Sequence, residues 1–79
     1  MLIQTEDALY DVDLAHSAYR LVEHGSRGDR LLGPWKRYDR ISPVEAGEPL
    51  RIFVSLEQTG RRLLYRVVTT APVTAVLAA

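Results

Sequence analysis

The clearest alternation of hydrophobic and polar positions runs from Pro49 to Thr70. Two β-rich runs, Leu50–Leu56 and Arg61–Thr69, flank the short connector Glu57–Gly60. A hairpin loop built on a type I turn places its last residue in the left-handed region, which glycine enters without a Cβ clash. The pattern therefore predicts an antiparallel β-hairpin closed by Gly60.

With Gly60 closing the loop, Phe53 would face Tyr65 and Ile52 would face Arg66 across the hairpin. Side chains alternate along a strand, so one face is predicted to be core and carries Leu50, Ile52, Val54, Leu56, Leu64 and Val68. The opposite face carries Phe53, Leu63, Tyr65 and Val67, with Arg51, Ser55, Glu57 and Arg61 around them. That second face is too apolar to be left in water, so a curled sheet or a partner should cover it.

The rest of the chain also favours short strands. Two of them are expected before residue 14, at Leu2–Thr5 and Ala8–Asp13, and another is expected in the segment from Trp35 to Ile41. Ala71-Pro72 is expected to break the hydrogen-bond ladder before a last strand at Val73–Leu77, because proline has no N–H to donate.

Leu14–His24 is ambiguous. Asp13 could cap a helix that ends at Gly25, with Leu14, Ala18, Leu21 and Val22 on one helical face. The competing interpretation is a turn at Asp13–Ser17 followed by a strand at Ala18–Glu23.

Together these patterns predict a single all-β domain over residues 1–79. The expected architecture is a small barrel or roll of about six short antiparallel strands, since closure removes exposed sheet edges. The alternative is an α+β domain with a helix at residues 14–24.

Composition narrows the range of functions. The chain has no cysteine, which excludes disulfides and cysteine-ligated zinc, and ten acidic residues balance ten basic ones. An Asp11-x-Asp13 pair has no third ligand or calcium-loop glycine after it, so no metal site and no cofactor are expected. No glycine-flanked serine nucleophile appears and neither histidine has a recognisable catalytic partner, so we expect no enzyme. Short apolar runs and an acidic start predict no membrane span or signal peptide, which makes the cytoplasm the expected compartment.

One cluster suggests a nucleic-acid interface. Its aromatic residues could stack on bases and its basic residues could reach phosphates; it comprises Trp35, Lys36, Arg37, Tyr38 and Arg40. However, nine of the ten basic residues are arginine and the chain has no asparagine. This bias is typical of a GC-rich genome and weakens the case that the arginines were selected for phosphate binding.

Several short pieces occur in a familiar order: Tyr10-x-Val-Asp13, then Glu45-x-Gly-Glu-Pro-Leu50, then Thr70-Ala-Pro-Val73. In this order the chain resembles small uncharacterised proteins of actinobacteria and their phages, which end in a T-S-P-V motif. Ala71 stands here in place of the usual serine. The resemblance implies an all-β chain, favours the turn and strand over the helix at Leu14–Glu23, and implies no catalytic residue.

The leading functional expectation is a small binding module that acts by protein–protein contact, with itself or with a host protein. Aromatic residues and arginine anchor such interfaces well. We expect the contact to centre on Phe53, Leu63 and Tyr65, with Arg51 and Arg66 at its rim. The alternative function is nucleic-acid binding through the Trp35–Arg40 segment.

Overall fold

The computed structural model describes residues 1–56 and 65–78, and every regular element in this part of the chain is a β-strand. The prediction of an all-β fold is therefore confirmed, although the structure has eight strands rather than about six. The strands are β1 (Leu2–Thr5), β2 (Leu9–Asp13), β3 (Ala18–His24), β4 (Arg30–Leu32), β5 (Lys36–Arg37), β6 (Arg40–Ile41), β7 (Pro49–Ser55) and β8 (Tyr65–Ala78). The predicted connector Glu57–Gly60 and the predicted strand positions 61–64 lie outside the described residues.

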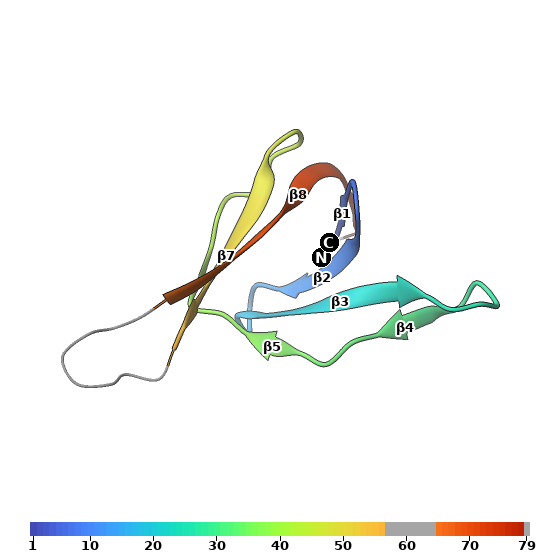
Figure 1. Cartoon of the computed structure of the whole chain (residues 1–79), viewed down its shortest axis with the longest axis horizontal. Helices are drawn as coiled ribbons and strands as arrows, with labels where there is room; N and C mark the ends of the chain where they lie inside the picture. The colour runs from blue at the N-terminus through green and yellow to red at the C-terminus, as the bar shows by residue number, and fades with distance from the viewer. Residues whose placement is uncertain (57–64, 79) are drawn as a thin grey trace.

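The strands form one antiparallel sheet in the order β4-β3-β2-β1-β8-β7-β6, and β5 pairs with β3 beside β4. Most neighbours in the sheet are also neighbours in sequence, as expected for a chain built from successive hairpins. The hairpin of β3 and β4 extends away from β7 and β8, as Figure 1 shows. Among the residues that the structure describes, there is no helix that could cross a membrane.

Strand β8 joins the two halves of the sheet. Its first part pairs with β7 from Tyr65 to Pro72, and its second part pairs with β1 from Val73 to Ala78. The expectation of a separate last strand at Val73–Leu77 was wrong, because β8 is continuous over 14 residues, although its ladder does change partner after Pro72. Irregularities in the register on both partner strands lie close to the change of partner, and such bulges bend a strand and locally disrupt its ladder. Proline fits at that point because a local gap in the ladder tolerates its missing N–H.

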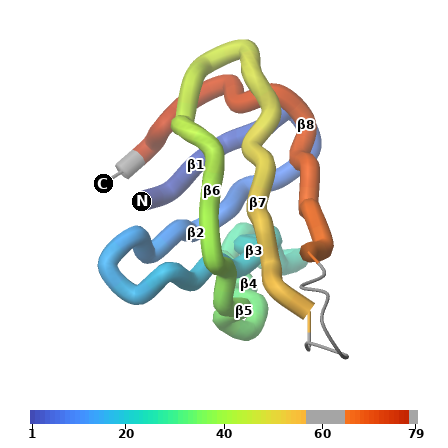
Figure 2. Tube along the Cα trace, turned by 90° about the vertical axis from the view of Figure 1, so that its left-hand side faces the viewer, coloured from blue at the N-terminus to red at the C-terminus, as the bar shows by residue number. Residues whose placement is uncertain are grey.

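The sheet curls but does not close into a barrel. Residues 36–41 run between its two ends, pairing with β3 through β5 and with β7 through β6. Between these strands, Tyr38 N–H donates to the Ser17 carbonyl at 2.9 Å and Asp39 N–H donates to the Phe53 carbonyl at 2.8 Å. Figure 2 shows how this segment brings β6 and β7 over β2 and β3. Of the two predicted forms, the structure is an open roll.

The core lies between the two halves of the curled sheet. Its buried members come from both halves and from the crossing segment: Ile3, Val12, Tyr19, Tyr38, Leu50, Ile52 and Val73. The rings of Tyr19 and Tyr38 contact each other in a tilted arrangement with their centroids 6.4 Å apart. In this core the Thr70 hydroxyl accepts a hydrogen bond from Leu50 N–H at 3.0 Å and donates to the Ala71 carbonyl. It therefore satisfies a buried backbone group beside the bulge.

The predicted register of the hairpin was wrong, whereas its two faces were assigned correctly where the structure describes them. Phe53 faces Val67 rather than Tyr65, and Tyr65 faces Ser55. The shift is two residues, and a shift of two leaves every side chain on its own face because the side-chain period is two. Accordingly Leu50 and Ile52 are fully buried, as expected for the core face, although Leu56 at the end of β7 is exposed.

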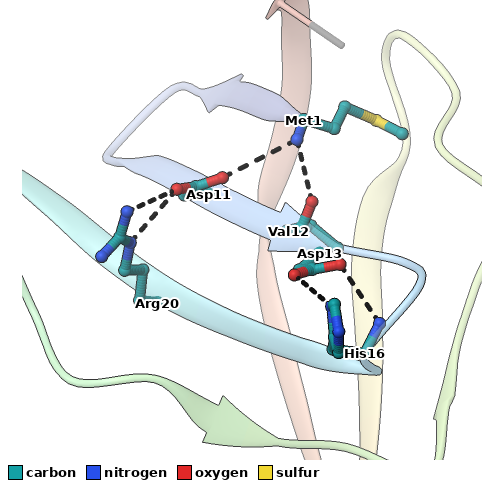
Figure 3. A network of polar contacts seen from close by, with 6 residues as sticks. All are labelled: Met1, Asp11, Val12, Asp13, His16 and Arg20. Carbon is teal, nitrogen blue, oxygen red and sulfur yellow. Dashed lines mark hydrogen bonds and ion pairs between the residues drawn. The ribbon is translucent and has the colours of Figure 1, made fainter.

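The ambiguous segment is a turn followed by a strand, so the helix at 14–24 was wrong. Asp13 Oδ1 accepts a hydrogen bond from His16 N–H at 3.1 Å, and Asp13 Oδ2 lies 2.8 Å from His16 Nδ1 (Figure 3). Ser17 then takes a positive φ of 50°, which ends the turn and directs the chain back along β2. In a helix, the backbone N–H and C=O groups of this segment would pair within the segment. Here β2 and β4 supply hydrogen-bond partners for β3, so Asp13 caps a turn instead.

Engineered disulfides should distinguish the observed register from the shifted one. In the variant Phe53→Cys with Val67→Cys the cysteines are directly opposite, within the Cα separation that a disulfide spans. We expect this variant to oxidise readily and to gain up to about 3 kcal/mol, the value for a loop of this length. The matched variant Phe53→Cys with Tyr65→Cys should oxidise slowly and gain nothing. Thiol titration and urea unfolding measure both effects, and the reverse order would show that the shifted register is populated.

The turn at Asp13 should show a measurable pH dependence. The His16 ring, which hydrogen-bonds the carboxylate, lowers the pKa of Asp13 below its usual value of 3.8. A carboxyl group with a lowered pKa stabilises the fold above its unfolded pKa, and this contribution is lost as the pH falls through the folded value. We expect His16→Ala to raise the pKa of Asp13 in a carboxyl NMR titration and to reduce this acid-side dependence, because backbone hydrogen bonds to Asp13 remain. His24→Ala, the matched control, should leave Asp13 unchanged.

Candidate protein-binding surface

The outer face of β6, β7 and β8 presents an apolar row that the core does not use. Arg40, Phe53 and Val67 face one another across the three strands, and Tyr65 lies two residues from Val67 on the same face. We call these four residues the outer patch. With Asp39 they line an open depression of about 550 Å³. Tyr65 is 51% exposed and Val67 is 46% exposed, so the patch is a real hydrophobic surface.

An arginine supports the aromatic centre of the patch. The Arg40 guanidinium lies over the Phe53 ring, 4.8 Å from its centroid, and Phe53 is half-buried. A cation–π contact at such a site contributes about 0.5–1 kcal/mol. Arg51 lies on the same face two residues before Phe53 and is exposed.

Side chains next to β6 fasten this short strand to β7. Ser55 N–H donates to Asp39 Oδ2, and Arg51 N–H donates to the Ser42 Oγ at 2.9 Å. In addition, Ser42 N–H donates to the Arg51 carbonyl at 2.9 Å. These contacts extend the pairing on both sides of a two-residue strand, and they position Arg40 rigidly over Phe53.

The structure brings together part of the interface predicted from sequence. Phe53, Tyr65 and Arg51 share the outer face, whereas Arg66 lies on the opposite face beside Val68. Leu63 lies outside the described residues. Val67 occupies the place opposite Phe53 that the predicted register gave to Tyr65. Arg40 joins the patch through the pairing of β6 with β7, and no local pattern in the sequence indicated that pairing.

The structure does not bring all five residues of the predicted nucleic-acid segment together, although Trp35, Arg37 and Tyr38 line one open depression. Tyr38 is only 8% exposed and packs in the core, where burial raises its pKa and the negative charge of Asp13 adds to the effect. Trp35 is 47% exposed, but the Arg20 guanidinium lies 4.1 Å from its ring centroid. Lys36 and Arg37 are exposed, and Arg40 lies over Phe53. A single partly covered tryptophan is not the row of stacking rings that single-stranded nucleic acid needs.

The two aspartates of β2 have separate partners, as Figure 3 shows. Asp11 Oδ2 accepts hydrogen bonds from Arg20 Nε and Nη2 at 3.1 and 3.0 Å, and Asp11 Oδ1 lies 3.7 Å from the amino nitrogen of Met1. Asp13 bonds His16 instead. Within residues 1–56 and 65–78, no group of three acidic, histidine or cysteine side chains is arranged to hold a metal ion.

Comparison of this chain with models of known protein families, with curated proteins and with solved structures finds no match. The geometry described above is therefore the basis for assigning a function.

Proposed function

We propose that this protein is a small non-enzymatic binding module that acts by protein–protein contact through the outer patch. The observation that carries the proposal is the exposed apolar row formed by Phe53, Tyr65 and Val67 on one sheet face. The core is complete without these residues, so packing within the described part of the chain does not account for their apolar character.

The chemistry of the patch matches that of protein interfaces. Their energetic centres are enriched in tyrosine, tryptophan and arginine, surrounded by polar groups that exclude water. Tyr65 offers a large apolar surface with a hydroxyl, Arg40 offers planar donors on a fixed ring, and Arg51 adds charge at the edge.

The partner that we propose is another protein or a second copy of this chain. The resemblance to proteins of actinobacteria and their phages extends the proposal to a host protein that the module would inhibit or redirect. Both versions use the same patch and make the same prediction for its substitution.

Tyr65→Ala should abolish or strongly weaken partner binding. Truncation of a central interface aromatic costs about 2 kcal/mol or more, which is a loss of about 30-fold in affinity. Stability should change little because the side chain is exposed. Partners would be identified by capture from an actinobacterial lysate with a photo-crosslinking residue at position 65, and self-association by sedimentation. Affinity would then be measured with the purified components.

Leu32→Ala is the matched control, because Leu32 is 55% exposed on β4, in the hairpin that extends away from β7 and β8. We expect this variant to bind like the native chain. If the protein stays monomeric at high concentration and Tyr65→Ala retains every captured partner, the outer patch is not the binding surface.

A further inference from the structure

A second concave site lies on the face of β8 opposite the outer patch. It is a groove of about 560 Å³ between β8 and the hairpin of β2 and β3. Arg66 and Val68 form one wall, and they alternate along β8 with Tyr65 and Val67 of the outer patch. The other wall and the floor come from Tyr10, Tyr19, Leu21, Glu23, Gly33, Pro34 and Lys36.

The backbone shapes this groove before any ligand is present. Tyr10 pairs with Leu21 and Tyr19 pairs with Lys36, so these four side chains stand on one face of neighbouring strands. Gly33 N–H donates to the Leu21 carbonyl at 2.9 Å, and a Cβ at Gly33 would approach that carbonyl oxygen to 3.1 Å. Glycine therefore allows the chain to pass close to β3, which keeps the wall thin and the groove open.

The floor of the groove is mainly apolar, and tyrosine hydroxyls supply hydrogen-bond donors. Tyr19 is buried and Tyr10 is half-buried, and both line the groove. Burial raises the pKa of Tyr10, and Tyr19 and Asp7 add to the effect. The Tyr10 hydroxyl therefore stays protonated at neutral pH and can donate to a ligand.

The side chains that line the groove carry a net charge of +1. Lys36 and Arg66 contribute two positive charges and Glu23 contributes one negative charge, a sum of +1. The two cations belong to different strands, β5 and β8, and both line the groove. An acidic group on a ligand would be attracted by both of them, whereas a neutral ligand would gain nothing from their charge.

We propose that this groove binds a small organic anion, an aromatic or aliphatic body that carries a carboxylate, sulfonate or phosphate group. The body rests on Tyr10, Leu21 and Val68, and the anionic group lies by Lys36 and Arg66. The volume falls within the range of small-molecule sites in proteins. This site is separate from the outer patch, and it does not depend on the proposed protein partner.

The test uses the full chain and a matched pair of fluorescent probes, anionic 1-anilinonaphthalene-8-sulfonate and neutral N-phenyl-1-naphthylamine. We expect the anionic probe to bind one site about five- to tenfold more tightly, because two partly solvated charges attract its sulfonate. NMR shifts of the amides should map it to Tyr10, Tyr19 and Leu21. Lys36→Gln and Arg66→Gln should each weaken the anionic probe about threefold or more and leave the neutral probe unchanged.

Arg66→Lys keeps the charge and should retain binding of the anionic probe, which separates loss of charge from loss of structure. Arg51→Gln removes a similar exposed charge from the opposite face and should have no effect. Equal affinity of the two probes, equal weakening by Arg51→Gln, or NMR shifts outside the groove would each overturn the assignment. Binding that survives Tyr65→Ala supports the independence of the groove from the outer patch.

Discussion

The structure depends on one strand that pairs with two partners. Strand β8 is hydrogen-bonded to β7 over its first half and to β1 over its second half, so the two halves of the sheet share a single backbone. Bulges near the change of partner bend the sheet, and the bend brings Leu50 and Ile52 of β7 against Ile3 and Val12 of the other half. A chain of 79 residues has little apolar surface to bury, and folding one sheet onto itself lets residues of both halves share one core.

The same strand separates two surfaces with different chemistry. Because side chains alternate, Tyr65 and Val67 point to the outer patch while Arg66 and Val68 point to the groove on the other side. The outer patch combines exposed aromatic and aliphatic side chains with an arginine, which is the composition of a protein interface. The groove is lined by two tyrosines and two cations, which suits a small anion. A module of this kind could carry a ligand on one face of β8 and contact a protein with the other.

Several arginines are held in place by contacts within the chain. Arg20 joins Asp11 on one side and covers Trp35 on the other, and Arg40 covers Phe53. Such contacts reduce the conformational freedom that an arginine would lose on binding, and they shield the apolar rings from water. They also separate residues that lie together in the basic and aromatic segment of the sequence. Trp35 contacts Arg20 of β3, Arg40 contacts Phe53 of β7, and Tyr38 is in the core.

The sequence by itself determined the strands and their faces. Alternation with a period of two placed Leu50 and Ile52 in the core and Phe53, Tyr65 and Val67 on the opposite face, and a register error of two residues left those faces unchanged. Only the tertiary structure decided the register itself, the continuity of β8 through Pro72, the burial of Tyr38 and the contact of Arg40 with Phe53. Each of these depends on pairing between strands distant in sequence, and local patterns carry no information on which distant strand will supply the partner. The turn at Asp13 lies between the two cases, because its residues permit both a helix and a turn, and pairing of β3 with β2 and β4 selects the turn.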